Sequence, residues 1–246
     1  MNNYAAVLEY DGTGFKGFQL QPKNVRTVQG ELLKALGVLL KSFHDFSYAG
    51  RTDAGVHARH QVINFKSEDQ LDLYRFKWKL NCILPEEIVV KDIKKAGSSF
   101  NARKDAKVRE YSYYVVNDNY QSVFLRKYSL MIGKPLDLKV MRLAAEKFVG
   151  TNDFAAFCNN NFHKSFTVKN VYSFRIRSYK GNILVFKIAA NSFLYNMVRI
   201  IVGTVLEIGR GQRSLDSIDI AFKSKDRKLA GKIAPAKGLF LTGVSY

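Results

Sequence analysis

The sequence predicts an α+β fold in which most of the strands are antiparallel. Strand-like and helix-like segments are interleaved along the chain, and a hairpin pattern joins one pair of strands directly. The two halves repeat a similar order of elements, with a boundary expected near Lys104. Hydrophobic residues make up 47% of the 246 residues, which is enough for a sizeable core. We therefore expect an N-terminal half at 1–104 and a C-terminal half at 105–246.

The first half is expected to begin with a strand and to continue into a helix. Apolar residues alternate from residue 3 to residue 10, as in a half-buried strand, and a glycine-rich loop follows. Thr27 is expected to cap the helix, because its side chain can accept a hydrogen bond from the first turn. The apolar face of this helix consists of Val28, Leu32, Ala35, Leu36 and Leu39. The other elements expected up to residue 116 are strands at 46–48, 61–65, 88–93 and 109–116 and a helix at 71–82.

The second half is expected to repeat this mixture. Asp137 is expected to cap a helix that ends at Gly150. The most apolar helix of the chain is expected at 193–208, with Gly209 as its stop signal. The other elements expected are a hairpin of strands 171–177 and 183–189 around Lys180, Gly181 and Asn182, a short helix after Ser214, and a final strand at 239–246.

The charge of the chain indicates a polyanionic partner. Lys and Arg total 39 against 21 Asp and Glu, which gives a net charge of +18. An excess of this size favours nucleic acid, through long-range attraction and the release of condensed counterions. An anionic membrane is the second candidate, and a solvated basic surface is the third interpretation.

The sequence also predicts the compartment. No stretch approaches the roughly 20 apolar residues that span a bilayer, and the N-terminus lacks the pattern of a signal peptide. Cys82 and Cys158 are isolated and match no metal or redox spacing. We expect a soluble, reduced, cytoplasmic protein with no membrane partner.

Several short motifs are rejected on their context. Gly12, Gly14 and Gly17 match the dinucleotide-binding pattern, but the expected helix starts about ten residues later, so a turn is the better interpretation. His57 and His60 would lie on opposite faces of a strand, which is unsuitable for a metal pair. The sequence has no phosphate-binding loop of the G-K-S/T type, which argues against ATP use.

The segment 50–58 is the first candidate for chemistry. Arg51 and Asp53 lie two residues apart in a loop that is bracketed by Gly50 and Gly55. Glycines let a ligand approach the backbone closely, and a nearby guanidinium would keep Asp53 ionised. The alternative, a turn held by a local Arg–Asp contact, is common in proteins.

Arg199 and a tyrosine pair are the other candidates. Arg199 lies within the apolar helix, where a buried arginine would need a carboxylate partner. The alternative is a solvated helix face, since Asn196, Arg199, Gly203 and Glu207 follow helical spacing.

Tyr111 and Tyr113 share one face of a strand that is flanked by basic residues. Rings interleaved with cations suit unpaired nucleotides, because rings stack on bases while cations hold phosphates. A pair of tyrosines that faces the core is the alternative, and the pattern does not choose between the two.

In these motifs the sequence resembles the tRNA pseudouridine synthase A family, over nearly its whole length and in order. The segment 50–58 is the most specific motif of that family and is complete here. The other matching residues are Tyr10, Asp11, Gly12, Phe15, Gly17, Gln19, Gln21, Thr27, Val28, Gln29, Gly30, Asn81, Leu84, Pro85, Phe100, Ala102, Arg103, Arg109, Tyr111, Tyr113, Asp153, Phe154, Phe157, Phe193, Leu194, Tyr195, Met197, Val198, Arg199, Val202, Gly203, Ala234, Pro235, Ala236, Gly238, Leu239 and Leu241.

The resemblance implies a role for each candidate residue. Asp53 matches the catalytic aspartate, Arg51 an arginine that engages the RNA or the flipped base, and Arg199 the arginine that pairs with the aspartate. Tyr111 matches the tyrosine that packs on the target uracil, and Leu239 matches an apolar residue on the other side of the base.

The resemblance also implies the fold and the substrate. It implies the pseudouridine synthase fold, in which two related α/β halves share a continuous, mostly antiparallel sheet with a central basic cleft. The N-terminal half carries the aspartate loop, and the C-terminal half carries the stacking tyrosine and the supporting arginine. The family acts as a homodimer at positions 38, 39 and 40 of the tRNA anticodon stem-loop, without a metal or cofactor.

The sequence departs from the family pattern at a few positions. Phe18 replaces a usual tryptophan and Glu87 a usual aspartate, while Asn101, Asn152 and Asn196 stand where histidine is common. These residues could alter RNA contacts, so they bear on site choice rather than on the chemistry.

Three rival functions remain on sequence grounds. They are a non-catalytic RNA-binding protein of RRM-like build, a synthase that acts on another RNA or another tRNA position, and an RNA chaperone with little turnover. All of them predict salt-sensitive RNA binding, so binding alone does not separate them.

Overall fold

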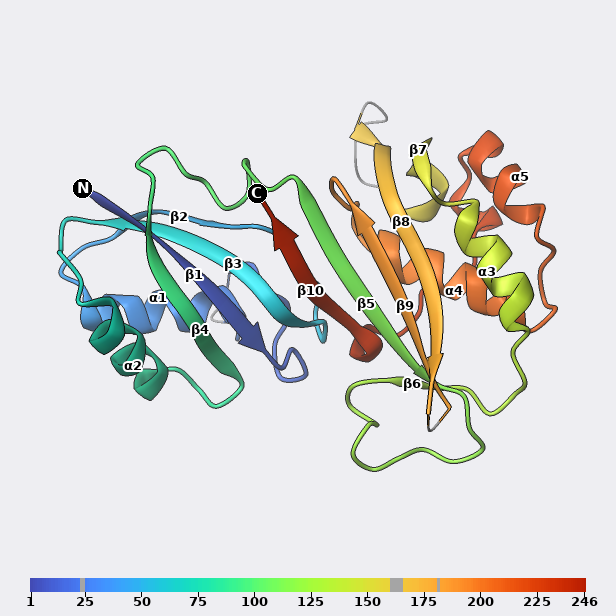
Figure 1. The fold of residues 1–246 in the computed structure, drawn as a ribbon, viewed down its shortest axis with the longest axis horizontal. Helices are drawn as coiled ribbons and strands as arrows, with labels where there is room; N and C mark the ends of the chain where they lie inside the picture. The colour runs from blue at the N-terminus through green and yellow to red at the C-terminus, as the bar shows by residue number, and fades with distance from the viewer. Residues whose placement is uncertain (23–24, 160–165, 181) are drawn as a thin grey trace. The chain divides into compact units, whose positions relative to one another are not determined.

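The computed structural model describes residues 1–22, 25–159, 166–180 and 182–246. The chain is of the α+β class with mostly antiparallel strands, which confirms the fold class predicted from the sequence (Figure 1). Contacts between Cα atoms divide it into two compact units. The first unit contains Met1–Lys107 together with Phe240–Tyr246, and the second contains Val108–Leu239.

The first unit is built around five strands. Strand β1 (Asn2–Tyr10) lies between β4 (Ile88–Ala96) and β3 (His57–Ser67) and is antiparallel to both. Strand β2 (His44–Tyr48) pairs with the second half of β3. The C-terminal strand β10 (Leu239–Ser245) pairs in parallel with the start of β3. The last strand of the chain is therefore anchored beside the beginning of β3.

Two helices cover one side of these strands (Figure 1). Helix α1 (Val28–Leu39) is capped as predicted, because the Thr27 side chain accepts a hydrogen bond of 3.1 Å from Gly30 N. Helix α2 (Leu73–Ile83) contacts α1 and β4. The buried face of α1 includes Leu32 and Leu36, so the predicted apolar face is the one that packs.

The second unit is built on an antiparallel meander. Its strand order is β5 (Val108–Val116), β9 (Ile183–Ala190), β8 (Val168–Tyr179) and β7 (Gly150–Asp153). The short strand β6 (Leu130–Met131) runs parallel to β5. The predicted hairpin corresponds to β8 and β9, although Gly181 in its turn lies outside the described residues.

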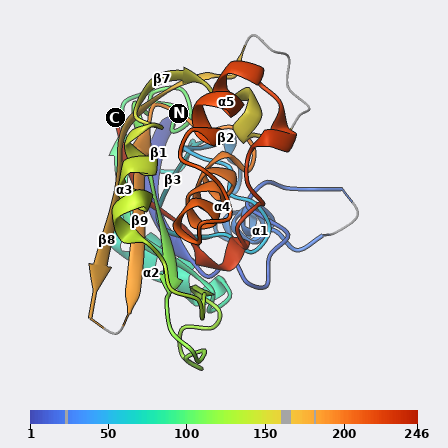
Figure 2. The same cartoon turned by 90° about the vertical axis from the view of Figure 1, so that its right-hand side faces the viewer.

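Helix α4 forms the centre of the second unit. Every residue of α4 (Met197–Gly209) is buried except Arg199 and Glu207, which are partly buried. Figure 2 shows α4 on one side of β8 and β9. Helices α3 (Leu138–Glu146) and α5 (Ser217–Ser224) complete the unit with a 3₁₀ turn at Phe154–Phe157.

Two predicted helix boundaries were wrong by a few residues. The helix capped by Asp137 ends at Glu146, while Gly150 adopts a φ of +104° and starts β7. The apolar helix begins at Met197 rather than at residue 193. Asn196 adopts a φ of +60°, which interrupts the helical conformation immediately before it.

The compact units differ from the expected halves, 1–104 and 105–246, mainly at the C-terminal strand. Residues 240–246 pack with the first unit because β10 pairs with β3. Apolar helices are present, yet in the part of the chain that the structure describes none is long and apolar enough to cross a membrane.

Candidate active site

The loop that carries Asp53 connects β2 to β3 in the first unit. Its first residue, Gly50, is held at both backbone groups by Gln61: the Gln61 amide donates to Gly50 O at 2.6 Å, and Gly50 N donates to the Gln61 side-chain oxygen at 3.2 Å. Gln61 is fully buried in β3. Arg51 is exposed, Thr52 is buried and Asp53 is partly buried. The loop thus leaves β2 at a fixed point with its charged side chains toward the surface.

A second loop, after β1, lies against the Asp53 loop and bonds to its backbone. Phe18 N donates to Thr52 O at 3.0 Å, and Gly55 N donates to Phe15 O at 3.3 Å. Within the Asp53 loop, Val56 N donates to Asp53 O at 3.1 Å. The carbonyls of Thr52 and Asp53 and the amides of Gly55 and Val56 are therefore fixed by hydrogen bonds.

A buried hydroxyl pair supports the same loop from β1. The Tyr10 hydroxyl lies 2.7 Å from Thr52 Oγ1, and both side chains are buried. Burial raises the pKa of Tyr10, and the hydrogen bond to Thr52 opposes that effect in part. Tyr10 remains a neutral phenol at physiological pH, which suits a positioning role rather than proton transfer.

Glycines make the contact between the two loops possible. A Cβ at Gly12 would lie 2.0 Å from Val56 O, far inside contact distance. Gly17 and Gly55 adopt φ angles of +99° and +75°, which side-chain-bearing residues rarely adopt. The pattern that mimics a dinucleotide site is thus used for a close loop–loop contact, and α1 begins only at Val28.

His57 closes this junction at the start of β3. Its Nδ1 accepts a hydrogen bond of 3.0 Å from Gly12 N and lies 3.1 Å from Asp11 Oδ1. Its ring stacks on Phe240 of β10 at 4.5 Å. His60 lies three residues further along β3, and no group of three or more metal-ligating side chains occurs among the described residues.

In the second unit, Arg199 is held by the chain that covers α4. Its Nε donates to Ala234 O at 2.8 Å, and one terminal nitrogen donates to Asn196 Oδ1 at 2.9 Å. Ala234 N donates back to Arg199 O at 3.1 Å. The guanidinium is therefore oriented by two hydrogen bonds, and a backbone hydrogen bond fixes Ala234 beside the start of α4.

The solvated-face interpretation of this helix was wrong. A Cβ at Gly203 would lie 1.7 Å from Lys232 O, so the segment 231–234 lies directly on the helix. Glu207 accepts a hydrogen bond of 2.9 Å from Lys232 N. The face that carries Arg199 is covered by backbone rather than by water.

The tyrosine pair on β5 faces the interior. Tyr113 is fully buried, and its hydroxyl donates to Pro235 O at 2.8 Å. Burial raises the pKa of Tyr113, and the charge of Arg199 opposes this in part. A Cβ at Gly238 would lie 2.7 Å from the Tyr113 ring, so the ring needs a glycine there.

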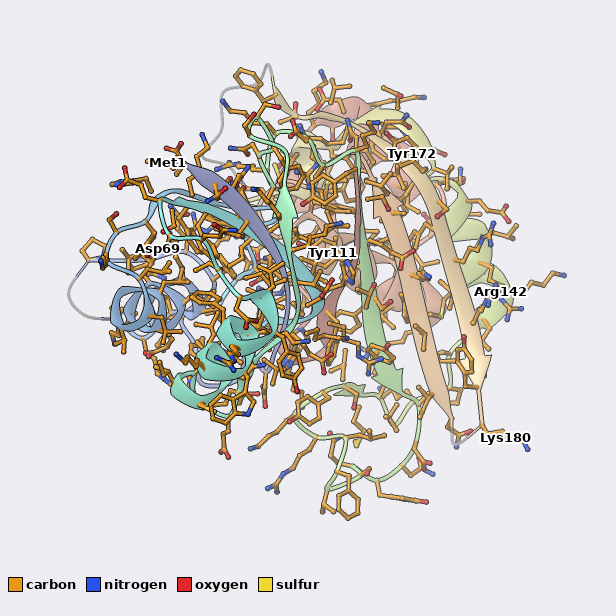
Figure 3. The ribbon with its side chains drawn as sticks, turned by 60° about the vertical axis from the view of Figure 1, so that its left-hand side comes forward. Met1, Asp69, Tyr111, Arg142, Tyr172 and Lys180 are labelled. Carbon is orange, nitrogen blue, oxygen red and sulfur yellow. The ribbon has the colours of Figure 1, made fainter. Side chains whose placement is uncertain are left out.

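Tyr111, which Figure 3 labels, lies two residues before Tyr113 in β5, so the strand spacing places both side chains on one face. It is 7% exposed, and its ring meets the edge of Phe193 at 5.2 Å. Leu239, at the start of β10, is also buried. The segment 234–239 thus contacts Arg199 and Tyr113 and ends at Leu239. It connects these three candidate residues within the second unit.

The comparisons with known proteins fit this arrangement. A family model described as tRNA pseudouridine synthase matches residues 6–103 and 144–246. The chain belongs to this family. Its members are isomerases that convert uridine to pseudouridine, so the chain is an enzyme of that class.

Curated relatives match over the full length. The tRNA pseudouridine synthase A of Geobacillus sp. (strain WCH70) is 46% identical over 241 residues, which cover 98% of this chain and 96% of that protein. Those of Brevibacillus brevis and Thermoanaerobacter sp. (strain X514) are each 41% identical over 246 residues, which cover 100% of both proteins.

Sequence reasoning found the charged candidates but missed several positioning residues. Gln61 and Thr52 are buried polar side chains whose partners are distant in sequence or are backbone atoms. A glutamine directly before the apolar Val62 and Ile63 of β3 was the available signal for Gln61, because a buried amide needs partners.

Proposed function

We propose that this synthase isomerises uridine in the anticodon stem-loop of tRNA, at positions 38, 39 and 40, with Asp53 as its catalytic carboxylate. The observation that carries the proposal is the fixed backbone around a partly buried aspartate. A preorganised carboxylate can act without a reorganisation cost during the reaction.

The chemistry explains why one carboxylate is enough. Pseudouridine forms when the base detaches at N1 and rejoins the ribose through C5, with no net gain or loss of atoms. The target nucleotide has to leave its stack before a side chain reaches the glycosidic bond. Asp53 then acts at C6 of the base, at C1′, or as the base that removes the 2′ proton.

The other residues are assigned supporting roles. Arg199 and Arg51 support the ionised carboxylate and the RNA, while Tyr111 and Leu239 contact the flipped base. The contacts of Arg199 with Ala234 and Asn196 support a fixed guanidinium, which is what such a role requires. We further propose that the enzyme works as a cytoplasmic homodimer.

The test is tritium release from unmodified tRNA labelled with [5-³H]uridine, because replacement of hydrogen at C5 frees tritium to water. We expect Asp53→Asn to lower kcat by at least about 1,000-fold while tRNA binding persists. Asp92→Asn, at an exposed position of β4, is the matched control and should behave as wild type. Retained turnover in Asp53→Asn would remove the catalytic assignment.

The proposed positions 38, 39 and 40 are tested with a separate set of tRNA substrates. Unmodified tRNAs with a single uridine at 38, 39 or 40, or at a position outside the anticodon stem-loop, would be compared at equal concentration. We expect product at all three positions and none elsewhere. Product formed only at a different position, or only in another RNA, would replace the substrate assignment without touching the role of Asp53.

A further inference from the structure

The connection between β5 and β6 exposes large apolar side chains in the second unit. We call residues 117–129 the aromatic loop; it extends beyond the ends of the strands of its unit (Figure 1). Tyr120 is 74% exposed, Val123 66% and Phe124 85%. A cluster of such exposed apolar side chains on a soluble surface indicates a binding function.

The aromatic loop is held at both ends. At its start, the Asn117 amide donates to Ile132 O and Lys134 O, each at 2.8 Å. At its end, the Ser129 hydroxyl donates to Leu125 O at 2.8 Å. The exposed rings therefore project from a braced turn, which lowers the entropy lost when they bind a partner.

The loop is tied to the segment that carries Leu239. The Lys237 ammonium donates to Arg126 O at 3.0 Å. Lys237 precedes Gly238, which packs on Tyr113, and Leu239, which is proposed to contact the target base. A substrate bound at these residues would have a braced, exposed surface next to it in the same unit.

The charge of the loop indicates the kind of partner. Within residues 117–129 the sequence carries Arg126 and Lys127 against one acid, Asp118. The Asp118 carboxylate accepts a hydrogen bond of 3.1 Å from Asn182. A second copy of the chain would bring the same cations and the same net charge of +18, whereas an RNA brings phosphates and flat bases.

We propose that the aromatic loop is an RNA-binding arm for the tRNA substrate: Tyr120 and Phe124 stack on unpaired bases beside the target uridine, and Arg126 and Lys127 hold the adjoining phosphates. The inference rests on the proposed function, because it takes the substrate of that site as its partner. Val123, which is 66% exposed on the same loop, adds apolar surface.

The first test compares tRNA binding and turnover in Phe124→Ala, Tyr120→Ala and the double variant. We expect Kd and KM for unmodified tRNA to rise roughly 5- to 50-fold for a single variant, with the loss in KM rather than in kcat. Phe124→Trp keeps a stacking ring and should restore binding. Tyr74→Ala is the matched control, since Tyr74 is 78% exposed on α2 in the first unit.

The second test separates charge from stacking. We expect Arg126→Gln with Lys127→Gln to reduce the slope of log Kd against log salt by roughly one to two, whereas Phe124→Ala leaves that slope unchanged. An unchanged slope in the charge variant would overturn the phosphate contacts.

Two outcomes would overturn the stacking role. One is binding by Phe124→Ala equal to that of Tyr74→Ala. The other is weaker binding accompanied by dissociation of an oligomer in sedimentation velocity, which would identify a second copy as the occupant. Measuring Kd directly keeps this test separate from the proposed function. A wild type that binds tRNA without releasing tritium would remove the proposed tRNA activity, and its Kd would still report on the loop.

Discussion

The Asp53 loop of the first unit and the framework around Arg199 in the second fix their functional residues in different ways. Around Asp53, backbone groups of one loop bond to those of another, as in Phe18 N to Thr52 O, and glycines allow the approach. Around Arg199, side chains reach backbone carbonyls, as Arg199 does to Ala234 and Tyr113 to Pro235.

The difference shows which substitutions each region tolerates. A loop packed backbone to backbone has no room for an added atom, so adding a methyl group is the most damaging change there. A framework built from side-chain donors loses one bond when a donor is removed, so its losses should be graded.

The largest effect is expected from Gly12→Ala. The new methyl group would lie 2.0 Å from Val56 O, and a rigid backbone on both sides prevents relaxation. We expect stability to fall by about 3 kcal/mol or more, and kcat to fall about 100-fold as Asp53 moves from its position. Urea unfolding and tritium release from tRNA measure the two effects.

Gly37→Ala is the control for this change. Apart from its chain neighbours and the backbone of its own helix, no described atom lies within 4 Å of a Cβ at Gly37, which is inside α1. Alanine is the better helix former, so this variant should gain up to about 1 kcal/mol and keep full activity. Equal behaviour of the two alanine variants would refute the close-packed description of the Asp53 loop.

Much of the fold could be predicted because its signals are local. The caps at Thr27 and Asp137 depend on a side chain and a backbone N–H three residues apart, and both form. The start of α4 was misplaced because the left-handed conformation of Asn196 leaves no mark in an apolar pattern. The parallel pairing of β10 with β3 joins residues about 180 positions apart, which no local pattern encodes.

In the candidate site too, features with a local sequence signal could be predicted and features that depend on distant segments could not. The segment 50–58 stood out because glycines, an arginine and an aspartate occur together. The two interpretations of Arg199 were equal on sequence, because helical spacing shows which residues share a face and not what covers that face. The covering segment around Lys232 is 29 positions from Gly203 in the chain, and only packing reveals it.

An intermediate effect is expected from removing the two buried hydroxyls. Tyr10→Phe loses the hydrogen bonds of Tyr10 with Thr52 and Gln61, and Tyr113→Phe loses the hydrogen bond to Pro235. Each variant should cost about 1–2 kcal/mol. Tyr10→Phe should lower kcat more, because Thr52 adjoins Asp53. A larger loss of kcat in Tyr113→Phe would mean that the contacts around Arg199 matter more for turnover than those around Asp53.

The same two tyrosines make the free energy of unfolding depend on pH. Burial raises the pKa of both phenols above that of an unfolded tyrosine, about 10. The native state therefore keeps protons that the unfolded state loses, so their stabilisation is complete below pH about 10 and decreases above it. The contribution of each tyrosine to that decrease totals about 1.4 kcal/mol between pH 9 and 11, and each phenylalanine variant should remove it in urea unfolding.

The smallest effect is expected at the outer edge of the loop after β1. Arg26 donates two hydrogen bonds to Glu87, at 2.9 and 3.1 Å, and its guanidinium lies 4.4 Å from the centre of the Phe15 ring. The hydrogen bond from Arg26 lowers the pKa of Glu87, so its contribution is present at neutral pH and is lost in acid. Both side chains are partly exposed, and Glu87→Gln should cost less than about 1 kcal/mol.

Salt identifies the origin of this small effect. The difference between wild type and Glu87→Gln should shrink from 50 mM to 1 M NaCl, because salt screens an exposed ion pair. Glu9→Gln breaks the pair between Glu9 and Lys91 at 3.0 Å in the same unit and is the matched control. If Glu87→Gln lowers kcat and Glu9→Gln does not, the ion pair contributes to the position of the loop that bonds to Thr52. Equal activity in both variants would mean that the buried backbone contacts alone hold Asp53 in position.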